Sequence, residues 1–206
     1  MLFTFQWGYF CGLNAIGGHE LLHKKETYNK IIGTWSYTKF MYSHFLDEHL
    51  KGHHKAVGTR EDPATARLNE SVYSFMLRSA FGSHINVWQR ECNRIRKEMG
   101  EDTPFILILF NNKMSMYFVI HMSILATIYF FLGIESLKYQ MFYTFWGIFF
   151  LELINYIEHY GIERKKDENG IYESISKMHS WNSYSSPVLF RLQRHSDHHS
   201  HAFRPY

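Results

Sequence analysis

Two long apolar runs lie close together in the second half of the chain, and they constrain the fold most strongly. The first is Met114–Ile134 and the second is Tyr139–Ile157. Each is close to the roughly 20 residues that a helix needs to cross the core of a bilayer. The short connector Glu135–Lys138 predicts a helical hairpin, and the aromatic residues at the edges of the runs are typical of a membrane interface. A buried core of a soluble protein is the alternative interpretation.

The rest of the chain is polar or amphipathic, and most of it is expected to be helical. Gly58–Pro63 is predicted to be a turn, and Gly100 is expected to stop an amphipathic helix. The fold class is therefore predicted to be all-α, a multi-span integral membrane protein forming one domain over residues 1–206. The expected segments are Met1–Lys25, a helix leaving the membrane whose part Phe3–Ile16 ends a further span; Glu26–Val57, mostly helical; Ala64–Met99, amphipathic helix; and Glu158–Tyr206, polar, with a turn at Asp167–Gly170 and a histidine-rich helix near the end.

The charged and sulfur-containing residues narrow the possible classes of protein. Lys+Arg 22 against Asp+Glu 19 gives a net charge of +3, which offers no case for nucleic-acid binding. Cys11 and Cys92 lie far apart, so neither a disulfide framework nor a thiolate metal site is expected. Basic residues gather in segments on one side of the spans, which predicts that this side is cytoplasmic. They are Lys24, Lys25, Arg90, Arg94, Arg96, Lys97, Arg164, Lys165 and Lys166.

Histidine is unusually abundant, with 14 residues, and most of them fall in four clusters. Residues three or four apart share one face of a helix, so each helical cluster can aim two or three imidazoles into one cavity. Imidazole suits zinc, copper, iron and nickel. Nine convergent histidines are too many for one ion and suit two. The clusters are GHELLHKK with His19 and His23, DEHLKGHHK with His49, His53 and His54, NYIEHYG with His159, and LQRHSDHHSH with His195, His198, His199 and then His201.

A zinc protease is a specific rival interpretation of the first cluster. HELLH matches the HExxH signature, in which Glu20 would be the general base. A zinc site of that kind uses two histidines and one further ligand, which leaves six clustered histidines unexplained. Four other histidines stand apart: His44, His84 and His121 are expected to be surface or hydrogen-bonded residues, although His121 lies within a predicted span, and for His179 a position near the site without metal binding is left open.

Several carboxylates accompany the histidines in sequence. A metal-bound histidine usually donates its second ring N–H to a carboxylate, a carbonyl or water. We therefore expect acidic side chains to support the ligands, with a solvated surface position as the alternative. Glu158 is adjacent to His159, so it is expected to serve a different histidine. The candidates are Glu20, Asp47, Glu48, Glu158 and Asp197.

The words GHELLHKK, EHLKGHH, NYIEHYG and LQRHSDHH, in this order, resemble the signatures of the membrane-bound alkane monooxygenase family, and HSWNS is also similar to that family. The histidine pattern alone is shared with membrane fatty acid desaturases, sterol hydroxylases and xylene monooxygenase. The resemblance implies two non-haem iron ions on the cytoplasmic side, O₂ as co-substrate, hydroxylation of a terminal alkane carbon, and electrons from rubredoxin and its reductase. By this resemblance the metal ligands are His19, His23, His49, His53, His54, His159, His195, His198 and His199.

Two expectations follow from the resemblance. An alkane has no polar handle, so its site should be an apolar slot, for which Phe142–Leu151 and in particular Trp146 are candidates, with lipid contact as the alternative. Family members have further spans before GHELLHKK and a tail after LQRHSDHH, so the chain is expected to be part of a longer domain or a degenerate copy. The alternatives are a fatty acyl desaturase, a fatty acid hydroxylase, an alkyl-aromatic hydroxylase, or a non-catalytic metal-binding membrane protein.

Overall fold

The computed structural model describes residues 2–182 and 194–201, and every named secondary-structure element within them is a helix. One isolated antiparallel bridge joins Lys166 to Tyr172 beside the predicted turn. The predicted all-α class is thus confirmed for the described part of the chain. The elements are α1 (Leu2–Leu22), α2 (Thr27–Thr38), α3 (Phe45–Glu48), the π-helix η1 (His49–His53), α4 (His54–Ala56), α5 (Val72–Met99), α6 (Phe105–Asn111), α7 (Lys113–His159), the 3₁₀ turn η2 (Lys177–His179) and α8 (His195–Ser200).

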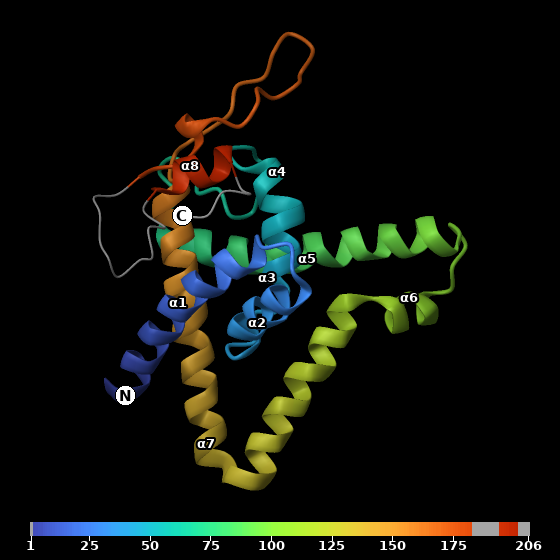
Figure 1. Cartoon of the computed structure of the whole chain (residues 1–206), viewed down its shortest axis with the longest axis vertical. Coiled ribbons are helices and arrows are strands. Elements are labelled where there is room, and N and C mark those ends of the chain that lie inside the picture. The colour runs from blue at the N-terminus through green and yellow to red at the C-terminus, as the bar shows by residue number, and fades with distance from the viewer. Residues whose placement is uncertain (1, 183–193, 202–206) are drawn as a thin grey trace.

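Helix α7 holds both apolar runs and bends sharply at Gly133 (Figure 1). Gly133 has φ 80° and ψ 175°, a conformation that only glycine adopts readily. The predicted connector Glu135–Lys138 is therefore wrong in position, because these residues are already helical and the chain turns before them. At 1.5 Å per residue the two arms, 113–132 and 134–159, are roughly 30 and 39 Å long.

The side chains of α7 are mostly exposed, which is unusual for so apolar a helix. Phe118, Phe130, Phe131 and Phe145 are each more than half exposed, and only 6% of the most apolar window of α7 is buried. A core helix of a soluble protein would be largely buried, so this surface fits contact with lipid. Among the described residues α7 is the one helix long and apolar enough to cross a membrane, so a multi-span fold is not confirmed.

Helix α5 begins later than predicted, at Val72 instead of Ala64. The Ser71 side chain caps it by accepting a hydrogen bond from Ser74 N, and Gly100, at φ 108°, ends it. The residues before Ser71 form a turn because the Arg78 guanidinium, reaching back from α5, donates to the carbonyl oxygens of Pro63 and Thr65. This turn leaves the polar segment that follows the second histidine cluster packed against the start of α5.

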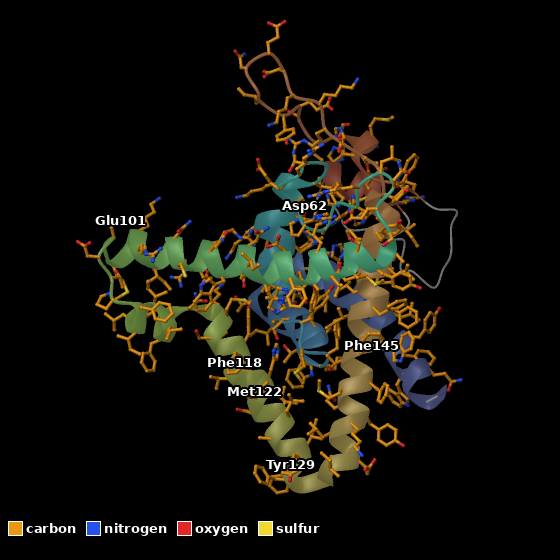
Figure 2. The ribbon with its side chains drawn as sticks, turned by 180° about the vertical axis from the view of Figure 1, so that it is seen from behind. Asp62, Glu101, Phe118, Met122, Tyr129 and Phe145 are labelled. Atoms are coloured by element: carbon orange, nitrogen blue, oxygen red, sulfur yellow. The ribbon has the colours of Figure 1, made fainter. Side chains whose placement is uncertain are left out.

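The core gathers the histidine-bearing ends of the helices at one end of the molecule. In Figure 1, α5 crosses between the two arms of α7 and the end that holds α4 and α8. Figure 2 shows Asp62 on one side of α5, and Phe118, Met122, Tyr129 and Phe145 on the other. The main core cluster joins α1, the segment around α2 and α3, and the second arm of α7, through Cys11, Ala15, Leu22, Tyr37, Phe40, Tyr42, Phe45 and Leu151.

Candidate metal centre

The structure brings all nine predicted ligands together, in two groups. In each group every histidine contributes one ring nitrogen, and these nitrogens all lie within 4.8 Å of one another. The ligands come from the end of α1, from η1 and α4, from the last residue of α7 and from α8. We call the groups the five-histidine group, formed by His19, His23, His49, His54 and His198, and the four-histidine group, formed by His53, His159, His195 and His199.

Adjacent histidines are divided between the two groups. His53 and His54 belong to different groups, and so do His198 and His199. Successive residues of an α-helix point about 100° apart, so one HH pair can serve two neighbouring ions. His49 shares a group with His54, five residues on, and the wider π-helical turn of η1 lies between them. Such local π turns occur often at functional sites.

In the five-histidine group the Nε2 atoms converge on His49. Its Nε2 lies 2.5 Å from His19 Nε2, 3.1 Å from His23 Nε2 and 2.9 Å from His54 Nε2. His198 Nε2 lies 3.0 Å from His54 Nε2. His23 and His54 are partly exposed, whereas the other three members are buried. This group thus has one side near the surface.

All four members of the four-histidine group are buried. His199 Nε2 lies 2.9 Å from His195 Nε2 and 3.2 Å from His53 Nε2, and His195 Nε2 lies 3.2 Å from His159 Nε2. No member is more than 5% exposed. The group therefore sits in the most protected part of the site.

Two carboxylates contact the four-histidine group. Asp62 Oδ2 lies 2.8 Å from His53 Nδ1, and Glu158 Oε2 lies 3.2 Å from His195 Nε2. The contact to Glu158 joins it to a histidine other than its sequence neighbour His159. Asp62 was not singled out from sequence, because its turn carries no metal-ligand spacing; only its place nine residues after His53 could have drawn attention.

Burial shifts the pKa of most of these imidazoles downward, since it disfavours the charged form. For His49, His54, His195 and His199 burial and then the neighbouring imidazoles hold the pKa well below the usual value of 6.5. Burial and then the charge on Lys24 lower the pKa of His23 to about 4, and burial and then His23 lower the pKa of His198 to about 2. These rings are neutral near pH 7 and present lone pairs.

The pair His53 and Asp62 behaves differently. Burial alone would lower the pKa of His53, but the charge of Asp62 and its hydrogen bond raise it. Burial would raise the pKa of Asp62, yet the His53 charge and the hydrogen bonds from His53 and Thr65 hold it below its usual range. A carboxylate bonded to Nδ1 fixes which nitrogen of His53 faces the other histidines.

The donor set fits two divalent transition-metal ions. Neutral imidazoles whose Nε2 atoms approach one another at 2.5–3.2 Å repel through their lone pairs unless a cation or proton lies between them. Nitrogen donors in such numbers suit iron, copper, nickel or zinc rather than calcium or magnesium. Asp62, whose pKa stays below its usual range, adds negative charge beside the four-histidine group, whereas burial raises the pKa of Glu158 well above its usual value.

The remaining predicted acids pair mainly with basic residues, and Asp197 also lies 3.5 Å from Nδ1 of His201, which belongs to neither group. Glu20 pairs with Lys24 at 2.8 Å, and Asp197 pairs with Lys177 at 2.9 Å. Glu48 is buried and pairs with Arg90. Asp47 binds Lys51 and Lys113 and accepts a hydrogen bond from Tyr117. The HELLH motif therefore places both histidines in the five-histidine group while its glutamate contacts a lysine, an arrangement unlike that of a zinc protease.

The other single histidines make hydrogen bonds outside both groups. His44 Nε2 bonds Ser83 Oγ at 3.0 Å, His84 Nδ1 bonds the Ala80 carbonyl oxygen, and His121 Nε2 bonds Ser43 Oγ at 2.8 Å. His179 Nδ1 accepts from Ser176 N. Around it HSWNS links two ligand-bearing elements: Ser180 and Trp181 donate to the Glu158 carbonyl oxygen, and Ser196 N donates to Asn182 Oδ1.

A narrow, mainly apolar cleft opens beside the histidines. Three ligands, His19, His49 and His195, reach it, and Asn155 and Glu158 are among its polar residues. Trp146 lies elsewhere, packed against Gly8 where a Cβ would overlap its side chain, about 20 Å along α7 from His159. A substrate contact by Trp146 stays a prediction. The apolar lining is formed by Ala15, Ile16, Tyr37, Phe45, Leu151 and Ile154.

Comparisons with known proteins identify the family of the chain. The family model described as "Fatty acid desaturase" matches residues 1–206, and the chain belongs to this family. Among curated relatives it is similar to the alkane 1-monooxygenase of Ectopseudomonas oleovorans, with 40% identity covering 95% of this chain and 48% of that protein.

Further relatives carry the same description. The chain is 39% identical to alkane 1-monooxygenase 1 of Alcanivorax borkumensis, over 95% of this chain and 48% of that protein. It is 35% identical to alkane 1-monooxygenase 1 of Pseudomonas aeruginosa, over 94% of this chain and 51% of that protein. The chain therefore spans about half the length of the curated relatives it matches.

Proposed function

We propose that this chain carries the two-iron centre of a membrane monooxygenase that hydroxylates the terminal carbon of alkanes or similar chains, using O₂ and an external reductant. One observation carries the proposal: nine imidazoles converge in two groups directly beside an apolar cleft. The relatives described as alkane 1-monooxygenases support the substrate class.

The protein's own residues have three tasks in this proposal. When bound, iron supplies the redox chemistry that activates O₂ and breaks a C–H bond. The nine histidines hold the ions, and their lowered pKa values keep the donor nitrogens free of protons. Asp62 orients His53 through Nδ1. Glu158 instead contacts Nε2 of His195, the nitrogen that faces the other histidines, so it does not orient that ring in the same way.

In this structure the cleft has a volume of about 20 Å³, room for about one water molecule, so a chain end would enter only after the side chains around it move. The walls of the cleft are mostly hydrocarbon and aromatic, so a saturated chain loses no hydrogen bonds on entry, whereas a polar molecule would. His19, His49 and His195 border the cleft, which would bring a chain end close to both groups of histidines. Trp146 would contact only a more distant part of a long substrate.

Membrane placement and partners complete the proposal. We infer that residues 1–206 form a single membrane domain, in which both arms of α7 cross the bilayer and the histidine end faces the cytoplasm. Lys55, Arg164 and other basic residues lie at that end, as expected for a cytoplasmic surface. Rubredoxin with its reductase, or an equivalent donor, would supply electrons there.

Metal and product analysis together test the function. The full chain, extracted in detergent and loaded with iron, should hold two irons per chain. With an electron donor it should convert octane or hexadecane to the 1-alkanol. A fatty acyl desaturase, which the family description favours, would instead give a double bond in a palmitoyl chain. Zinc as the bound metal, or a double bond as the product, would contradict the proposal.

A non-catalytic metal protein is the remaining alternative, because the chain spans about half of its relatives. Two irons with no product from any hydrocarbon, under conditions in which a longer relative turns over, would support that alternative.

A further inference from the structure

One buried acid in the second arm of α7 has no place among the metal ligands or their supports. Glu152 is 2% exposed. Its Oε1 accepts a hydrogen bond of 2.7 Å from the Tyr42 hydroxyl, and its Oε2 makes no hydrogen bond among the described residues. The side chains of Ser79 and Asn155 also interact with the carboxyl. An ionisable residue inside a membrane segment is rare and marks a functional position by default.

Glu152 lies on the side of α7 that leads to the metal centre. Asn155 and His159 follow it at i+3 and i+7, so the three residues share one buried face. His159 belongs to the four-histidine group, two turns or about 10 Å further along the helix. Asn155, between them, lines the cleft that His19, His49 and His195 border. The Glu152 carboxyl is also among the groups that interact electrostatically with His53.

A chain of hydrogen-bonding groups runs from Glu152 toward the surface. The Tyr42 hydroxyl also lies 3.5 Å from Ser83 Oγ, which lies 3.0 Å from His44 Nε2. The His44 ring packs against the exposed ring of His84, with centroids 3.6 Å apart and the ring planes tilted by 40°. Both histidines line a cavity of about 630 Å³ between α5, α6 and the first arm of α7.

We propose that Tyr42 and Glu152 form a proton relay, which takes protons from the His44 end and delivers them toward the metal centre. The inference rests on the proposed function. Hydroxylation combines R–H, O₂, two protons and two electrons from a one-electron donor protein, and gives R–OH and water. Because the Asn155 amide cannot carry a proton, each proton would cross the roughly 10 Å from Glu152 to the metal centre through water. Both protons would end on the oxygen atom that leaves as water, and Glu152 regains its proton from Tyr42 and the groups behind it.

The geometry favours a relay over a purely structural tie. A structural tie needs only an acceptor for the Tyr42 hydroxyl, which an amide would provide equally well. A carboxyl with one oxygen bonded to a donor and the other without a hydrogen bond is suited to hold a proton on one side and release it on the other. The rest of the chain, hydroxyl to hydroxyl to imidazole, consists of groups that can both donate and accept.

Glu152→Gln and Tyr42→Phe test the relay. Both variants should bind two irons, but the alkanol formed per electron consumed should fall, by at least about tenfold in Glu152→Gln, with hydrogen peroxide released instead. Tyr156→Phe is the control, because it removes a part-buried hydroxyl that donates to the Glu70 carbonyl oxygen at 2.7 Å and takes no part in the relay. This variant should form as much alkanol per electron as the wild type. Wild-type coupling in Glu152→Gln would overturn the relay and leave the proposed function intact.

A second measurement needs no metal and no turnover. The infrared spectrum of the metal-free protein should contain the carbonyl stretch of a protonated carboxylic acid that is missing from Glu152→Gln and shifted in Tyr42→Phe. Identical spectra for Glu152→Gln and wild type would also overturn the relay. A wild-type chain that binds iron and forms no product would refute the proposed function, and the relay with it.

Discussion

The two histidine groups differ in their protection and in their acidic partners. The five-histidine group has more donors, but His23 and His54 are partly exposed. The four-histidine group has fewer donors, all buried, and contacts Asp62 and Glu158. The fold therefore prepares its two sites for metal in different ways. One site relies on the number of ligands, and the other relies on burial and on Asp62, which holds the His53 ring in place.

The largest expected effect comes from replacing His198 or His199, the adjacent histidines on α8 that belong to different groups. His199→Ala leaves the buried group with three histidines, so we expect loss of one iron and a fall in turnover of more than about 100-fold. His198→Ala leaves four histidines in the other group, so iron binding there should weaken by only about tenfold. Iron analysis and activity of both variants check this. Equal iron loss in the two variants would remove the distinction.

Asp62→Asn tests the carboxylate support of the four-histidine group. The amide keeps the shape of the side chain but removes the charge that raises the pKa of His53. We expect metal affinity to fall by about 10–100-fold, the usual effect of losing such a partner. Competition with a chelator measures the change. Glu20→Gln is the matched control, because Glu20 pairs with Lys24, and its affinity should stay within about twofold.

A chelator should remove the ion of the five-histidine group before the ion of the four-histidine group. The partly exposed rings of His23 and His54 give water and chelator a path to the five-histidine group, whereas the other group has no exposed member. We therefore expect two kinetic phases, and in His198→Ala the faster phase should become faster still while the slower phase is unchanged. A single phase in the wild-type protein would mean that the two groups exchange metal at the same rate.

Residues of the site differ in whether the sequence alone could predict them. The nine ligands could be predicted, because their spacing on short helices is a local property. The division of His53 from His54 could also have been derived from the helical repeat. Asp62 could not, because it reaches His53 only when Arg78 holds the turn before α5 in place. Glu152 was missed for a similar reason, since its partner Tyr42 is 110 residues away.

Segment boundaries failed where tertiary contacts or backbone conformation decided them. The start of α5 depends on side chains that reach back from the helix itself. The bend of α7 depends on a single glycine with positive φ, whereas the charged residues 135–138 had suggested a later turn. Hydropathy patterns locate apolar runs well, but they do not reveal the residue at which a helix changes direction.

The smallest expected effect is a dependence of the metal-free protein's stability on pH. The pKa of His23 falls from 6.5 to about 4 on folding, and the pKa of His198 falls to about 2. Above pH 6.5 these rings are neutral in both states and contribute no pH dependence. As the pH falls below 6.5 the unfolded chain binds protons that the folded chain does not, so stability decreases until the folded pKa is reached. Each such ring costs about 1.4 kcal/mol one pH unit below 6.5.

His53 acts in the opposite direction, because its pKa is raised by Asp62. It contributes stability below pH 6.5 that is lost as the pH rises through its folded pKa. Glu158, whose pKa burial raises, acts in the same direction as His53. Because the pKa is lowered for a larger number of histidine rings, the net slope should be positive between pH 5 and 6.5. Thermal unfolding of the metal-free chain in detergent measures the slope. In Asp62→Asn the opposing contribution of His53 disappears, so the slope should become steeper; an unchanged slope would show that Asp62 does not set the charge of His53.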